Sequence, residues 1–379
     1  MEMVAATAEY VSPTPASGAL PRRAAWDALA DTASDANPFY HPALLQPALD
    51  HLKRDGLHVL EAHDDGQLIG LMPVIALARH SRYPVRNSGN WMHEQCFYGA
   101  PLLRTGYEVA AWGSFLSQLD ASHWAGNFLH MDGLDRNGPA AAALLACCAT
   151  ERRAIRCIAS HKRALLQSNL SADDYWQSNV RSKKRKEIRR LIKRLEEMGT
   201  VTHARLRDGG DIAVWTEDFL ALEGAGWKGA EGTALAGQDN SRAYFREALS
   251  HMHATGMLDM LRIDLNGAPV AMLVNFYMGR GAFSYKIAYD ERLARFSPGV
   301  LIEIDNLHAA LSDLGLDWMD SCAAPNHPMI DGIWAERRTM AQYRVALRGT
   351  GFKALKRNLA FTAIGLAETT ARKFKRKQA

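Results

Sequence analysis

Two stretches of this chain repeat one pattern, and the repeat limits the folds open to it. They read "HDDGQLIGLMPVIAL" near residue 66 and "DLNGAPVAMLVNFYM" near residue 267. In each, an Asp-Gly or Asn-Gly pair separates two apolar runs, which is a strong local signal for an antiparallel hairpin. The elements expected around the two hairpins also follow one order, so the sequence predicts two domains of the same plan.

The second half shows this plan more fully than the first. Its expected elements are a strand at 201–208, helices at 211–227 and 241–256, strands at 257–265, 269–278 and 282–290, a helix after Ser297, and strands at 316–320 and 340–349. The first half is expected to have helices near Trp26 and at 42–52, the hairpin, a strand at 97–104, a helix from Gly106, a strand at 127–134, a helix from Pro139 and a strand at 154–160.

This order indicates an α/β (α+β) protein in which each domain has a mixed, mostly antiparallel sheet flanked by helices. The predicted boundaries are a flexible tail at 1–23, a first domain at 24–168, a second at 169–349 and a basic tail at 350–379.

The composition is typical of a soluble globular protein, with 47% hydrophobic and 23% charged residues. No uninterrupted apolar run reaches the roughly 18 residues that a membrane span needs. The five cysteines are odd in number and include no C-x-x-C pair, which argues against a disulfide framework and a zinc site. The first residues do not resemble a secretory signal, so we expect a cytoplasmic protein without a metal.

Positive charge is concentrated in two segments. Arg181 to Arg194 contains nine Lys or Arg against one Glu, and 350–379 contains eight against one. Because the whole chain carries only +4, the remainder is acidic. The first segment predicts a helix with one apolar face and one basic face, suited to a carrier protein, a tRNA or anionic lipid. The second is compatible with a helix on an anionic membrane and equally with a disordered end, so the protein would be peripheral to the inner membrane at most.

One predicted helix start lacks the usual anionic residues. Ser297 suits the N-cap and Pro298 the first helical position, but the first acid inside the helix is Glu303. We expect the N–H groups of Gly299, Val300 and Leu301 to be open to an anion, with Arg295 adding charge from outside. The matching helix of the first half opens with Thr105 and Glu108, which predicts a capping box that would exclude an anion.

The order of elements, together with several local stretches, resembles the GNAT acyltransferases, and the doubled arrangement is similar to their FemAB/CelD-like branch. The stretches are "KKRKEIRRLIKRLEEMG", "FLALEGAGWKGAEGTAL", "RIDLNGAPVAMLVNFYMG", "YKIAYDERLARFSPGVLIEI" and "DSCAAPNHPMIDGIWAERR". The resemblance is stronger from Arg181 onward than before it, and implies that the first domain is degenerate and the second holds the donor site.

In GNAT proteins, the turn before this helix holds the pyrophosphate of coenzyme A. Carried over by position, that role falls to Arg295, Ser297, Gly299 and Val300. The chain departs from the family pattern because Pro298 removes one N–H donor and the second Gly is absent. The donor is therefore left open among acyl-CoA, acyl carrier protein and aminoacyl-tRNA.

Three residues are candidates for the chemistry of acyl transfer, which needs a base, oxyanion donors and positioning. Lys286 is either an acceptor-site lysine or one that extends from a sheet edge to solvent. Asp320 is either a base or anchor for the acceptor, or the cap of a turn. Glu223 either lines an acceptor pocket or is a solvated helix residue. No base accompanies Cys322, so direct transfer is preferred to a covalent intermediate.

The resemblance implies an enzyme that moves an acyl group from acetyl-CoA or a longer acyl-CoA to an amine or hydroxyl. The branch favours an envelope precursor or an exopolysaccharide sugar as acceptor. The first rival is a Fem-like transferase that uses aminoacyl-tRNA, and the second is a non-catalytic scaffold of polysaccharide synthesis. The acceptor, the acyl length and the oligomeric state stay open.

Overall fold

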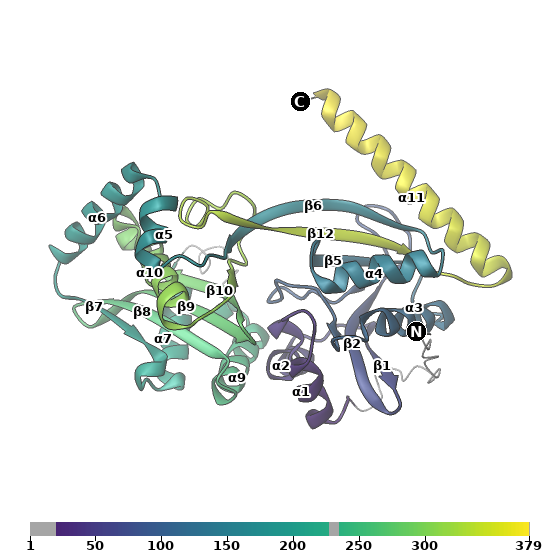
Figure 1. The fold of residues 1–379 in the computed structure, drawn as a ribbon, viewed down its shortest axis with the longest axis horizontal. Coiled ribbons are helices and arrows are strands. Elements are labelled where there is room, and N and C mark those ends of the chain that lie inside the picture. Colours follow the sequence, from purple (N-terminus) through teal and green to yellow (C-terminus); the bar gives the residue numbers. More distant parts are fainter. Residues whose placement is uncertain (1–19, 227–234, 379) are drawn as a thin grey trace, which may run out of the picture. The chain divides into compact units, whose positions relative to one another are not determined.

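A computed structural model describes residues 20–226 and 235–378 of the chain (Figure 1). Its contacts divide the chain into two compact units. Unit 1 comprises Met1–Pro42, Arg54–Ser160 and Met340–Ala379, and unit 2 comprises Ala43–Lys53 and His161–Thr339. The sequence predicted one boundary between the domains, after residue 168. In the structure, two boundaries between the units fall within strands, β6 (Ile155–Leu166) and β12 (Glu336–Ala346), so each strand runs from one unit into the other.

Unit 1 contains a sheet in the order β1-β2-β3-β5-β12, with β4 beside β2. Neighbouring strands are antiparallel except β3 and β5, which are parallel. The strands that lie wholly in this unit are β1 (Leu57–Asp64), β2 (Gln67–Leu77), β3 (Asn87–Asn90), β4 (Leu102–Leu103) and β5 (Phe128–Asp135). Its helices are α1 (Arg23–Asp31), η1 (Pro38–Tyr40), α3 (Glu108–Ala121), α4 (Pro139–Thr150) and α11 (Gly351–Gln378).

Unit 2 contains a sheet in the order β6-β11-β10-β9-β8-β7, in which only β10 and β11 are parallel. Its other strands are β7 (Val201–Arg205), β8 (Leu258–Leu265), β9 (Ala268–Met278), β10 (Gly281–Tyr289) and β11 (Trp318–Asp320). Its helices are α2 (Pro42–His51), α5 (Ala172–Asn179), α6 (Ser182–Glu196), η2 (Leu206–Asp208), α7 (Ile212–Gly224), η3 (Leu235–Gly237), α9 (Asp239–Ala254), η4 (Glu291–Phe296), α10 (Pro298–His308) and the short π-helix η5 (Ala309–Asp313). The predicted class, a mostly antiparallel sheet flanked by helices, is confirmed.

Both predicted hairpin turns are confirmed. Asp65 and Gly66 join β1 to β2 with φ of 45° and 76°, and Asn266 and Gly267 join β8 to β9 with φ of 54° and 80°. Two successive left-handed residues are what a two-residue hairpin turn requires, and Asp, Asn and Gly tolerate that conformation best.

Two local predictions in the first half are wrong. The capping box does not form, because the Thr105 hydroxyl donates to the Thr32 carbonyl and Glu108 accepts instead from the N–H of Gly106. The N-cap of α3 is Tyr107, which makes no side-chain cap. The strand expected at 97–104 shortens to the two residues of β4.

Helices cover both faces of the sheet in unit 2. Asn275 and Phe276 are neighbours on β9 and point to opposite faces. Asn275 donates to Asn306 on α10, and Phe276 packs against Tyr285, which interacts with Tyr244 on α9. Helix α10 therefore lies over one face of the strands that carry the candidate site, and α9 lies over the other.

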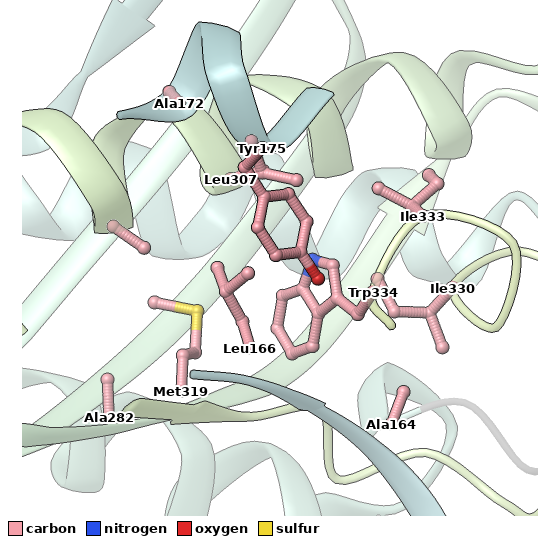
Figure 2. Packing of buried hydrophobic residues seen from close by; sticks show 11 residues of the cluster. Ala164, Leu166, Ala172, Tyr175, Ala282, Leu307, Met319, Ile330, Ile333 and Trp334 are labelled. Carbon is pink, nitrogen blue, oxygen red and sulfur yellow. The ribbon is translucent and has the colours of Figure 1, made fainter. Parts of the chain in front are cut away.

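A buried cluster on the α10 side joins α5, the end of β6, β11 and the loop after it (Figure 2). Tyr175 and Trp334 lie close together at its centre in Figure 2, and Tyr175 is fully buried. Its hydroxyl donates to Glu336 and accepts from the N–H of Ala335, at 2.7 Å each. These bonds hold the loop between β11 and β12 against the core, because a buried hydroxyl is costly unless it is paired.

Candidate active site

The edge of β10 that faces β11 is paired along only part of its length. β9 pairs with β10 from Gly281 to Tyr289, but β11 pairs only with Gly281 to Phe283. From Ser284 onward, no strand in the described part of the chain lies along this edge. An edge that lacks a neighbouring strand can take up an extended ligand, as the edge strands that bind peptides do.

A β-bulge lies at the point where β11 leaves β10. Ser284 is opposite Asn275 and Lys286 is opposite Val274, so Tyr285 has no counterpart on β9. The Lys286 Nζ lies 5.3 Å from the centre of the Tyr285 ring, which indicates that the bulge brings these two neighbouring side chains to the same side. Lys286 is half-buried, not extended fully into solvent.

Several polar groups interact with the Tyr285 side chain, which lies on the face of the sheet that α9 covers. Burial raises the pKa of the Tyr285 hydroxyl well above its usual value, with further contributions from Tyr244, Glu223 and Cys322. Tyr285 therefore stays neutral and is not a base at ordinary pH. The same contributions place Glu223 within electrostatic reach of the bulge.

Glu223 is buried on α7, which contradicts the prediction of a solvated helix residue and supports the pocket alternative. Its side chain is 4% exposed and accepts a 2.9 Å hydrogen bond from the N–H of Leu235. Glu223 also lines a cavity of about 20 Å³ beside Ile287 and Tyr289 of the open half of β10. The structure thus brings Glu223 to the strand that carries Lys286.

Asp320 is completely buried at the end of β11 and is held by two guanidinium groups. Arg163 approaches it to 2.7 Å and Arg338 to 2.8 Å, and the N–H of Cys322 donates to it at 2.9 Å. Burial alone would raise the pKa of Asp320, but the two arginines outweigh it and lower that pKa. Since a carboxylate with a lowered pKa is a poor proton acceptor, the geometry favours the predicted cap over the predicted base.

The start of α10 confirms one part of its prediction and corrects another. The helix begins at Pro298 as predicted, and no acid lies in its first turn. Ser297, which was expected to cap the helix, instead adopts a left-handed conformation with φ of 52° and makes no side-chain cap. The N–H groups of Val300 and Leu301, however, donate to the Ser297 carbonyl at 2.8 and 3.2 Å. They are therefore not open as expected, and the N–H of Gly299 is the one without a backbone partner among the described residues.

Gly299 is buried rather than facing open solvent. A Cβ at this position would lie 2.8 Å from the Met329 Cε and 3.2 Å from the Tyr289 Cδ1. Arg295 is exposed, has no ion-pair partner in the described part of the chain, and packs over Phe296. Its neighbour Arg292 instead pairs with Asp290 at 2.8 Å. Arg295 is thus the cation at this helix start that is open to an external anion.

The basic helix predicted at 181–194 packs beside this helix start. Ile188 and Leu195 of α6 share a buried cluster with Phe296, Leu301 and Ile302. The predicted apolar face is largely confirmed, because Leu191 is buried as well, although Ile192 is 37% exposed. Its exposed cations, none of which pairs with an acid among the described residues, are Lys183, Lys186, Arg189, Arg190, Lys193 and Arg194.

A buried polar network that no sequence pattern predicted lies beneath α10. Glu303 is 7% exposed, and burial raises its pKa to about 7, although a hydrogen bond from Asn306 opposes that rise. Asn306 also accepts from Asn275 at 2.8 Å. The only signal in the sequence is an acid and an amide three residues apart on an otherwise apolar helix face. Nothing in that spacing shows that both are buried.

This chain resembles known proteins in the sequence of one domain and in its fold. Residues 182–327 match the Acetyltransferase (GNAT) domain family, Acetyltransf_6. No curated protein sequence matches the chain.

Three solved structures share the fold across both units. FemX has a TM-score of 0.57 and 10% identity, with 86% of this chain and 96% of that chain covered. A conserved protein of unknown function from Bacteroides thetaiotaomicron has a TM-score of 0.54 and 13% identity, with 86% and 98% covered. L-PGS from Bacillus licheniformis has a TM-score of 0.52 and 12% identity, with 91% and 97% covered.

At such low identity these likenesses show the fold alone, and they do so along nearly the whole length of each relative. The domain match adds that the second half, which contains the bulged strand and the uncapped helix start, is of the acetyltransferase type. Residues 182–327 therefore match the GNAT acetyltransferase domain family, within a chain whose fold is similar to that of FemX.

Proposed function

We propose that this enzyme transfers an acyl group from acetyl-CoA or another acyl-CoA to an amine or hydroxyl, with its donor site in unit 2. The observation that carries the proposal is the half-paired edge of β10, which leads along the strand to η4 and the start of α10. The arm of coenzyme A contains amide groups that match the backbone groups of an open strand edge. Its pyrophosphate would bind near Gly299 and Arg295.

In this reaction, the acceptor nitrogen or oxygen attacks the thioester carbonyl carbon, and the C–S bond then breaks. The acceptor loses a proton and the leaving thiolate gains one. Glu223 is our candidate for receiving the acceptor proton, because it is buried beside the bulged strand. Lys286 lies on the same strand and would position an anionic group of the acceptor, while Asp320 positions the end of β11. Ser297 and Val300 set the course of the backbone at the helix start.

The donor site is tested by calorimetric titration of coenzyme A into the wild type and two alanine variants. Arg295→Ala should weaken binding about tenfold, or about 1.4 kcal/mol, because it removes an unpaired cation. Arg292→Ala is the matched control, since that guanidinium already pairs with Asp290. Equal loss in both variants, or no binding to the wild type, would contradict the assignment.

Turnover is tested by following coenzyme A release with acyl-CoA donors of increasing length and pools of amine and hydroxyl acceptors. An envelope precursor or an exopolysaccharide sugar is the favoured acceptor, in accordance with the resemblance to CelD-like proteins. Release that depends on both donor and acceptor supports the proposal. The match of residues 182–327 to an acetyltransferase domain family favours an enzyme over the non-catalytic scaffold.

A second candidate donor is aminoacyl-tRNA, which the unpaired cations of α6 favour. A small donor cannot span that face, whereas a polyanion or an acyl carrier protein can. Charge reversal at Lys183, Lys186 and Arg190 should weaken tRNA binding strongly and flatten its salt dependence, with little effect on coenzyme A. Lys184 is left unchanged because its side chain packs near Gly332. A Cβ added to Gly332 would lie 3.8 Å from the Lys184 Cε. The absence of tRNA binding by the wild type would exclude this candidate, and tRNA binding unchanged by the charge reversal would exclude α6 as its binding surface.

A further inference from the structure

The C-terminal helix α11 is attached to unit 1 by one of its faces. Phe361 and Ile364 are buried in a cluster with Phe128 of β5. Arg357 is 2% exposed and donates to the backbone carbonyls of Gly126 and Asp120 at 2.9 and 3.0 Å. This inward face accounts for the docking of the helix.

Ionic contacts hold the same face farther along the helix. Glu368 accepts from Arg344, which is completely buried on β12, and lies 3.1 Å from His80. Lys353, near the start of α11, donates to the Asp120 carbonyl at 2.8 Å. The inward face is therefore secured near its start and beyond its middle.

The outward face of α11 carries an apolar stripe that no described residue of unit 1 covers. Phe352, Leu355, Leu359 and Leu366 are 80, 55, 60 and 64% exposed, and they are the four most exposed large apolar side chains in the described part of the chain. Their spacings of three, four and seven residues place them along one line, opposite the buried face. An exposed apolar surface of this kind marks a site of association with a protein or a membrane.

The charge of residues 350–379 favours a membrane over a protein as the partner of this apolar stripe. Residues 350–379 contain eight Lys or Arg against one Glu, and five of those cations fall between residues 372 and 377. Glu368, the one acid, is already neutralised by Arg344. Pairing two copies of α11 would bring like charges together, whereas an anionic bilayer would neutralise them.

No helix in the described residues is long and apolar enough to cross a membrane, α11 included. An amphipathic helix with a basic end instead lies in the plane of the interface, with its apolar side chains inserted among the headgroups. We propose that α11 binds the surface of an anionic lipid bilayer through Phe352, Leu355, Leu359 and Leu366, with its basic end against the headgroups. This surface is separate from the proposed acyl-transfer site and does not depend on it.

The test uses full-length protein and sedimentation with phosphatidylcholine vesicles that contain or lack phosphatidylglycerol. The wild type should bind only the anionic vesicles, and added salt should weaken the binding. The double variant Leu355→Glu/Leu359→Glu should bind at least tenfold more weakly. Point substitutions are preferable to deletion of α11, because deletion would uncover Phe128 and leave Arg344 unpaired.

The matched control is Val109→Glu/Leu145→Glu, which adds the same charge at exposed apolar positions on α3 and α4 of unit 1. This control should bind vesicles like the wild type, and thermal unfolding should show that both double variants are folded. The proposal is overturned if the wild type does not bind anionic vesicles or if both variants lose binding equally. It is also overturned if the stripe variant only turns a dimer into a monomer in light scattering while vesicle binding persists.

Discussion

Replacing Gly299 by Asp tests whether the start of α10 binds a phosphate-bearing donor. The N–H of Gly299 has no backbone partner among the described residues, and the first turn of the helix contains no acid. A carboxylate placed there would occupy the N–H and repel phosphate, whereas the helix itself accepts an acid in its first turn.

The structure changes how this variant must be designed. Because a Cβ at Gly299 would lie 2.8 Å from the Met329 Cε, Asp adds a steric cost that the sequence did not reveal. Gly299→Ala adds the same Cβ without the charge, so the difference between the two variants isolates the carboxylate. The atom in the way is the end of a flexible side chain, so we expect both variants to fold with similar, modest losses of thermal stability.

We expect coenzyme A to bind Gly299→Asp at least tenfold more weakly than Gly299→Ala, a difference of about 1.4 kcal/mol. This is a modest demand for the loss of a charge-assisted hydrogen bond, which contributes about 1.5–3 kcal/mol. Isothermal titration of the two variants and the wild type measures it. Equal affinities for the Ala and Asp variants would refute the reasoning, because the added charge would then meet no anion.

Three further predictions concern buried carboxylates. Glu223→Gln retains an oxygen that can accept the hydrogen bond from the Leu235 N–H, but it cannot accept a proton from the substrate. We expect kcat to fall at least tenfold with little change in coenzyme A affinity, and an unchanged kcat would show that Glu223 is not the general base. Asp320→Asn removes the carboxylate charge that Arg163 and Arg338 share. It should lower the free energy of unfolding by about 3–5 kcal/mol in urea titrations, whereas a loss below about 1 kcal/mol would show that this ion pairing is unimportant. Burial raises the pKa of Glu303 to about 7, so the folded state holds its proton longer than the unfolded state does. Stability should therefore fall between about pH 4.5 and 7 by up to about 1.4 kcal/mol per pH unit, and Glu303→Gln should remove this slope; parallel pH profiles for the wild type and the variant would contradict it.

Local sequence determined the turns and the kind of element at most positions. Asp65-Gly66 and Asn266-Gly267 formed the expected hairpins because the left-handed conformation is a property of those residues themselves. The start of α10 at Pro298 and the apolar face of α6 were predictable for the same reason, since the fixed φ of Pro and the periodicity of apolar residues are local properties. The positive charge of the helix at 181–194 and of residues 350–379 follows from the sequence composition alone.

Only the tertiary structure decided which polar groups are buried and what they meet. Arg163 and Asp320 are 157 residues apart, and no local pattern announces that pair. The capping box at Thr105 failed because a hydroxyl that could cap its own helix found the Thr32 carbonyl, which belongs to another segment. The bulge at Tyr285, the burial of Glu223 and the Met329 side chain over Gly299 likewise depend on packing between distant segments. Turn chemistry is encoded residue by residue, whereas burial and pairing arise only once the strands and helices have packed together.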